Sequence, residues 1–152
     1  MDALNIAREY DSIQYIVIKI GEEQYGIDIS YVDNIVRMQN ITRVPHVQDY
    51  FAGVINLRGE VVPVMSLRLK MKLAADEYTK ETRIIIVKLE NNAPIGLIVD
   101  EVNEVVTLDE RSIDEVIDKK GEETFINGIG KNGDTLISLL DLNTVIGDKD
   151  VV

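Results

Sequence analysis

The stretch Ile16-Val17-Ile18-Lys19-Ile20 decides the fold because it recurs in nearly the same form as Ile85-Ile86-Val87-Lys88-Leu89. The first copy shows the period-two pattern of a half-buried strand. The second belongs to the nearly continuous apolar run Arg83–Leu89, which predicts a strand buried on both faces. The chain is also rich in Ile and Val, whose branched side chains favour strands.

The similarity continues in the same order along both halves of the chain. Further matched pairs are Gly26 with Gly96, Val32 with Val102, Ile35 with Val105, Gly53 with Gly128, Gly59 with Gly133, and Leu67 with Leu142. This order and its near-constant offset indicate an internal duplication, with halves at about 13–73 and 83–147 joined by the polar connector 74–82. A duplicated set of short strands predicts an all-β fold of two small barrel lobes with a few short helices. We expect the lobes to pack together and share core, and the pattern leaves open an exchange of strands between the halves.

Short helices are predicted where capping residues precede apolar positions. Asp28 or Ser30 would cap a helix that carries Ile29, Val32 and Val36 on one face. Ser66 and Asp141 occupy matched positions and would each cap a short closing helix. Residues 1–12 and 148–152 are predicted to be a flexible segment and a tail.

The charge balance restricts the partners. The formal net charge of −11 disfavours binding to nucleic acid and to an anionic membrane surface. The chain has no Cys, which excludes disulfides and thiolate chemistry and suits a reducing cytoplasm. Its N-terminus lacks the apolar core of a signal peptide, and its apolar runs are too short to span a bilayer, so direct membrane insertion is not expected.

No catalytic, metal-binding or cofactor-binding motif is evident in the sequence. The sole histidine, His46, stands beside a proline in a predicted surface loop, whereas a catalytic triad requires a histidine held by partners. The acidic pairs at 100–101, 109–110 and 114–115 lack the spacing of a calcium loop. Gly128-Ile129-Gly130 lacks the third glycine of a dinucleotide motif, and Asn132-Gly133 instead predicts a type I′ hairpin turn. These absences favour a non-catalytic binding module.

The segment Gly53-Val54-Ile55-Asn56-Leu57-Arg58-Gly59, followed by Val61-Val62-Pro63-Val64, resembles the signature of the CheW family. The resemblance extends from about Ile13 to Ile146. It implies two five-stranded barrels similar to Src-homology-type barrels. It also implies a stand-alone, non-catalytic chemotaxis adapter without cofactors, which couples methyl-accepting chemoreceptors to the histidine kinase CheA. Such an adapter is cytoplasmic and joins membrane-bound receptor arrays through protein contacts, including contacts with the CheA regulatory domain.

The receptor tip in this family is a helical hairpin, which suggests a helix docking against apolar side chains. Together with the repeat, the resemblance makes Ile29, Val32, Ile35, Val99 and Val102 candidate receptor contacts. The alternative is that these residues form ordinary core between the lobes. Arg58 corresponds to the family's signature arginine and would contact a partner, brace its own turn, or do both.

For the kinase side, the candidates are Arg43, Val44 and Pro45 with Gly53, because a glycine permits close backbone approach. Two positions depart from many family members, since Asn34 replaces Glu and Ser66 replaces Asp. Two other functions stay open from the sequence alone. One is a small-molecule-binding barrel that uses the cleft between the lobes, and the other is an enzyme with unrecognised carboxylate chemistry.

Overall fold

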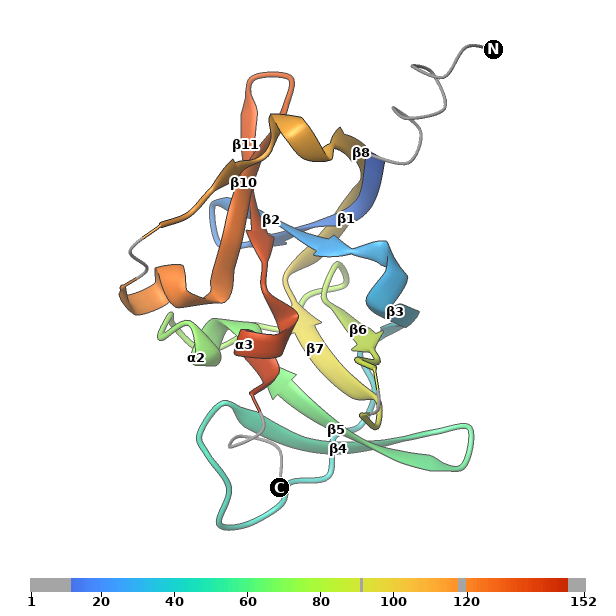
Figure 1. Ribbon diagram of the computed structural model, residues 1–152. Helices are drawn as coiled ribbons and strands as arrows, with labels where there is room; N and C mark the ends of the chain where they lie inside the picture. Colours follow the sequence, from blue (N-terminus) through green and yellow to red (C-terminus); the bar gives the residue numbers. More distant parts are fainter. Residues whose placement is uncertain (1–11, 91, 118–119, 148–152) are drawn as a thin grey trace.

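The computed structural model describes residues 12–90, 92–117 and 120–147, and it is mostly β (Figure 1). The predicted N-terminal segment and tail lie outside the described residues, except that Ser12 already begins the first strand. The strands are β1 (Ser12–Ile20), β2 (Glu23–Asp28), β3 (Val32–Arg37), β4 (Phe51–Leu57), β5 (Glu60–Ser66), β6 (Arg83–Val87), β7 (Ile95–Val99), β8 (Glu101–Asp109), β9 (Asp114–Glu115), β10 (Ile126–Asn132) and β11 (Thr135–Leu140). The helical elements are η1 (Ile29–Tyr31), α2 (Leu67–Lys70), η2 (Glu110–Ser112), η3 (Gly121–Phe125) and α3 (Leu142–Ile146).

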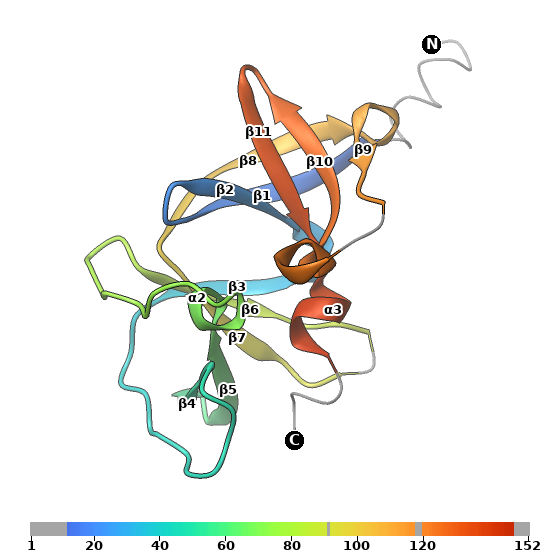
Figure 2. The ribbon, with the colours of Figure 1, turned by 90° about the vertical axis from the view of Figure 1, so that its left-hand side faces the viewer.

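The strands form two sheets, and each sheet draws on both halves of the sequence. The six-stranded lobe has the order β8-β1-β2-β11-β10-β9, and the five-stranded lobe has the order β3-β6-β7-β5-β4 (Figures 1 and 2). Under the sequence repeat, β8-β1-β2-β11-β10 corresponds strand by strand to β3-β6-β7-β5-β4. The agreement extends to register, since the parallel pair Leu139 and Gly26 matches the parallel pair Val64 and Gly96. The duplicated two-lobe fold is therefore confirmed, with β1 and β2 exchanged for β6 and β7.

Each lobe closes through a short segment that pairs with its far strand. In the six-stranded lobe, the chain leaving β8 returns as β9, whose Asp114 pairs with Ile129 of β10. In the five-stranded lobe, Thr42 makes the equivalent bridge to Val54 of β4, with two backbone N–H···O distances of 2.8 Å. These closures turn each sheet into a small barrel.

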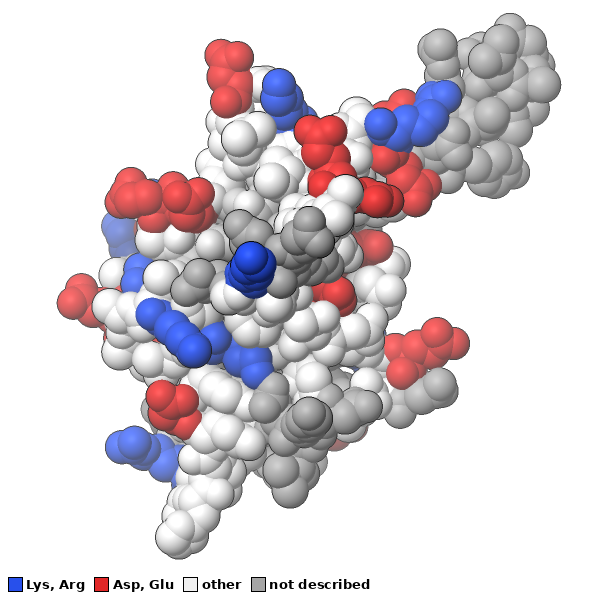
Figure 3. Space-filling model, turned by 60° about the vertical axis from the view of Figure 1, so that its left-hand side comes forward, with Lys and Arg blue, Asp and Glu red and all other residues white. Residues whose placement is uncertain are grey.

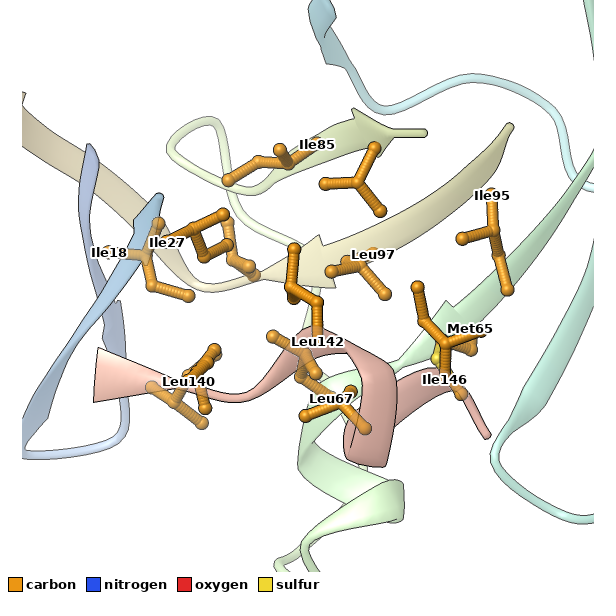
Figure 4. Packing of buried hydrophobic residues seen from close by; sticks show 14 of the residues in the cluster. Ile18, Ile27, Met65, Leu67, Ile85, Ile95, Leu97, Leu140, Leu142 and Ile146 are labelled. Atoms are coloured by element: carbon orange, nitrogen blue, oxygen red, sulfur yellow. The ribbon is translucent and has the colours of Figure 1, made fainter. Parts of the chain in front are cut away.

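The buried apolar residues of the described chain form three clusters. Six residues fill the interior of each lobe, and eighteen form a cluster shared between the lobes. Figure 4 shows the shared cluster, in which Ile18 and Leu140 of one lobe lie on the left and Met65 of the other lobe lies on the right, with Leu97 and Leu142 between them. Because the shared core is larger than either interior, the two lobes stabilise each other.

The predicted helix over 29–36 is wrong, because only the 3₁₀ turn η1, capped by the Asp28 side chain, is helical. Val32–Arg37 is the edge strand β3, paired with β6. A bulge at Asp33 shifts the register, so that Val32 and Ile35 lie opposite Val87 and Ile85, which both belong to the shared core. Val32 packs against the shared core, whereas Val36 packs against the interior of the five-stranded lobe, so the two residues do not share a face as the predicted helix required. The predicted caps Ser66 and Asp141 are both present, and their side chains accept the N–H groups of Leu69 and Thr144.

The predicted Asn132-Gly133 turn is displaced by one residue. Asn132 pairs directly with Thr135, so the loop consists of Gly133 and Asp134, and of these residues only Gly133 has a positive φ. That combination is typical of a type II′ turn instead of type I′.

A polar network joins the two lobes at their connector. Arg68 of α2 binds Asp100 through two hydrogen bonds, with Nε–Oδ1 at 2.8 Å and Nη2–Oδ2 at 2.5 Å. The Gly21 N–H of the β1–β2 turn donates to the same carboxylate at 2.8 Å. Nearby, the Ser66 hydroxyl donates to Asp76 of the connector, whose other carboxylate oxygen is buried without a partner among the described residues.

The two carboxylates of this network are expected to respond oppositely to pH. Burial raises the pKa of Asp100, but hydrogen bonds from Arg68 and Gly21 and the Arg68 charge outweigh burial and lower it overall. Burial raises the pKa of Asp76 despite the Ser66 hydrogen bond. The contribution of Asp100 to stability is therefore present above its unfolded-state pKa and is lost as pH falls through its folded-state pKa. The contribution of Asp76 has the opposite sign, and it is lost as pH rises through the raised pKa of Asp76.

At neutral pH we therefore expect Asp100→Asn to lower the free energy of unfolding by about 1–2 kcal/mol, a value reduced for partial solvent exposure of the pair. Asp76→Asn should be neutral or stabilising, because it removes a buried charge. Urea denaturation of both variants between acidic and neutral pH measures this. If the free energies of unfolding of the two variants changed with pH in the same way, the opposite roles of Asp100 and Asp76 would be contradicted.

Candidate protein-interaction surface

Exposed apolar side chains gather on the edge strands of the two lobes, on the side of the shared core. In β8, Val102 and Val105 lie opposite Ile18 and Ile16 of β1, both residues of the shared core. In β3, Val32 and Ile35 likewise lie opposite shared-core residues of β6. Because β3 and β8 correspond in the repeat, two pairs of positions are equivalent, namely Val32 with Val102 and Ile35 with Val105. We call these residues, together with Ile29 of η1, the junction surface.

Exposure separates the candidate receptor contacts into three groups. Ile29 and Ile35 are 36% and 38% exposed. Val32 and Val102 are half-buried and pack against the shared core. Val99 has no accessible surface, so the expectation that it lines a groove is wrong. Val99 lies in the central part of its sheet, on a strand with neighbours on both sides, whereas β3 and β8 are edge strands.

Arg58 lies at the tip of the β4–β5 hairpin. Leu57 pairs with Glu60, which leaves Arg58 and Gly59 as a two-residue loop with φ values of 54° and 84°. Positive φ at both positions is the pattern of a type I′ turn. The Arg58 side chain is exposed and makes no hydrogen bond to any residue that the structure describes, so bracing of the turn is not observed. Its five donors are available to a partner.

The candidate kinase contacts divide in the same way. Arg43, Val44 and Pro45 are exposed in the loop that follows the Thr42 bridge, and Val44 is 40% exposed. Gly53, in contrast, is buried. A Cβ atom on Gly53 would lie 2.2 Å from the Thr42 carbonyl oxygen. The predicted close backbone approach exists, but it occurs inside the lobe and not across an interface with another protein.

Several exposed apolar residues were not predicted as contacts. Val61 and Leu136 occupy matched positions on the two hairpins and are 67% and 57% exposed. Val105 matches Ile35 in the repeat, and that match was the available signal for it. Val47 extends the exposed apolar surface of the loop that carries Val44.

Acidic side chains predominate on the upper part of the molecule in Figure 3, and many Lys and Arg side chains gather lower on the same face. Over the described ranges, no three His, Asp or Glu side chains are grouped as a metal site would require. No helix in those ranges is both long and apolar enough to cross a bilayer.

A family model described as "CheW-like domain" matches residues 14–150. The chain belongs to the CheW-like family. The chemotaxis protein CheW of Bacillus subtilis is 39% identical over 89% of this chain and 86% of its own length. CheW of Helicobacter pylori is 36% identical over 88% of this chain and 81% of its own. The crystal structure of the scaffolding protein TtCheW from Thermoanaerobacter tengcongensis has a TM-score of 0.82 and 34% identity, and the match covers 88% of this chain and 92% of that one. The fold described above is therefore shared with a solved CheW structure.

Proposed function

We propose that this chain is a non-catalytic adapter that couples chemoreceptors to the histidine kinase CheA in membrane-associated arrays. The observation that carries the proposal is the junction surface, where two equivalent edge strands present aliphatic side chains beside a well-packed core. Exposed apolar side chains on a rigid framework are suited to receive an amphipathic helix. Membership of the CheW-like family supports the chemotactic context.

The adapter needs a second surface for the kinase, and the exposed loop at 43–47 is our candidate. Val44 and Val47 are 40% and 39% exposed, and Arg43 is exposed beside them. Apolar residues beside an arginine are common at the centres of protein interfaces. Ile35 and Val44 belong to different segments, so single substitutions can test the two surfaces separately. Arg58, at the tip of the β4–β5 hairpin, stays a proposed receptor contact.

Ile35→Asp is expected to weaken capture of a chemoreceptor cytoplasmic fragment roughly tenfold or more, because it replaces an apolar contact with an unpaired charge. It should leave capture of the CheA regulatory domain unchanged, and Val44→Asp should do the reverse. Pull-down with each purified partner measures both effects, after circular dichroism confirms the fold. Leu136→Asp is the matched control, since it places the same charge on an exposed aliphatic site elsewhere. The two-surface proposal would be refuted if all three variants lost capture of both partners. It would also be refuted if no variant lost capture of either partner.

A further inference from the structure

The six-stranded lobe contains a cavity of about 310 Å³ that the proposed function does not use. It lies at the end of the lobe where β1 begins and β2 ends, beside η2 and the start of α3. Its apolar lining includes Ile13, Ile113 and Leu139. Its polar lining includes four carboxylates, from Asp28, Glu110, Glu115 and Asp141, and no Lys or Arg lines it. Its volume is within the usual range of small-ligand sites.

Tyr15, a largely buried residue, also lines this cavity. Tyr15 is only 8% exposed, and its ring packs in the interior cluster of the lobe. Its hydroxyl has no hydrogen-bond partner in the described part of the chain, yet it is not among the side-chain atoms sealed from solvent. Burial raises the pKa of Tyr15, and the charges of Asp28 and Glu110 raise it further. A hydroxyl that has no protein partner and borders a cavity is free to hydrogen-bond a bound ligand.

The duplication provides an internal comparison. Tyr15 and Asp28 are direct cross-strand partners in the six-stranded lobe, and their equivalents in the other lobe, Ile84 and Ile98, are also direct partners. Both isoleucines are fully buried in an apolar interior. The neighbouring matched positions Ser66 and Asp141 differ as well. The Ser66 hydroxyl donates to the connector carboxylate of Asp76, whereas Asp141 lines the open cavity. The polar pair is therefore a feature of one lobe and not a requirement of the barrel.

We infer that this cavity binds an aliphatic cation, namely an ammonium or guanidinium group on a short alkyl chain. The apolar lining would accommodate the alkyl part, the carboxylates would attract the charge, and the Tyr15 hydroxyl would accept a hydrogen bond from the cationic N–H. The cation would come from a basic side chain of a partner protein or from a free small amine. The inference is independent of the receptor and kinase surfaces proposed above.

The test is a titration of the ¹⁵N-labelled full chain with butylammonium, butylguanidinium and butanol, followed by NMR. Both cations should shift amide signals around Asp28, Tyr31, Glu115 and Asn127 with millimolar affinity, and butanol should bind roughly tenfold more weakly or not at all. Shifts scattered over the acidic surface, or equal binding of butanol, would overturn the inference.

Three variants make the assignment specific. Tyr15→Phe and the double variant Glu110→Gln/Glu115→Gln should each weaken cation binding severalfold, and the double variant changes only exposed residues, so its fold should persist. Glu22→Gln removes an exposed charge outside the cavity and should leave the affinity unchanged. If Glu22→Gln weakened cation binding as much as the cavity variants do, the assignment of the site would be overturned. If butylammonium lowers capture of CheA or receptor by the wild type, the natural cation is a side chain of that partner. If butylammonium binds without lowering capture of either partner, the natural cation is a free amine.

Discussion

Gly53→Ala is expected to lower the free energy of unfolding by about 3–5 kcal/mol, from the combined costs of overpacking and of a strained backbone. Gly53 has a φ of 143°, which side-chain-bearing residues rarely adopt. A methyl group there would lie 2.2 Å from the Thr42 carbonyl oxygen and 2.8 Å from its carbonyl carbon. Since Thr42 closes the five-stranded barrel through its bridge to Val54, the clash would open the barrel.

Chemical denaturation of Gly53→Ala against wild type measures this effect. Gly133→Ala is the matched control, because Gly133 also has a positive φ, of 65°, but no atom lies within 4 Å of the position that the new methyl group would take. It should cost about 1 kcal/mol from backbone strain alone. Equal losses in the two variants would show that the Thr42 contact does not matter for stability.

Leu97→Ala should cost about 2–5 kcal/mol, because it empties a fully buried position in the shared core. Leu97 belongs to the five-stranded lobe but packs in the cluster that both lobes use (Figure 4). The cavity should therefore destabilise both lobes together, and unfolding should stay a single cooperative transition.

Native-state hydrogen exchange distinguishes the two lobes in this variant. Protection of amides in β1 and β11 should fall as much as protection in β6 and β7. Leu136→Ala, at a 57% exposed position, is the control and should have little effect on either lobe. A fall in protection confined to the five-stranded lobe would contradict the role assigned to the shared core.

The duplication could be predicted from sequence because the repeat is carried by short strings such as Ile16–Ile20 and by matched glycines. Strand partners could not be predicted in detail, since β1 fits beside either β3 or β8 by hydrophobic pattern alone. Pairing is decided by contacts between residues far apart in the chain, which local patterns do not report. The bulge at Asp33 could not be predicted either, and Val32 and Val36, which the predicted helix placed on one face, pack against different apolar clusters in the folded chain.

The candidate contacts also include some features that sequence could predict and others that only the fold decides. Sequence identified Ile35 and Val44 as apolar positions, but exposure depends on whether a strand lies at an edge or in the middle of a sheet. Val99 and Gly53 were therefore assigned to surfaces although both are buried. The cavity around Tyr15 was not predicted at all, because its lining comes from distant segments that only the folded barrel brings together.

The exchange of strands between the halves also bears on how such a chain originates. Half of the sequence cannot complete either barrel, because each barrel takes two strands from one half and the rest from the other. Two identical half-length chains with this topology would complete both barrels only as an intertwined dimer. Joining them end to end replaces a bimolecular assembly by an intramolecular one, so the fold no longer depends on protein concentration. A joined chain also allows the two copies to differ, as Tyr15 and Asp28 of one barrel differ from Ile84 and Ile98 of the other.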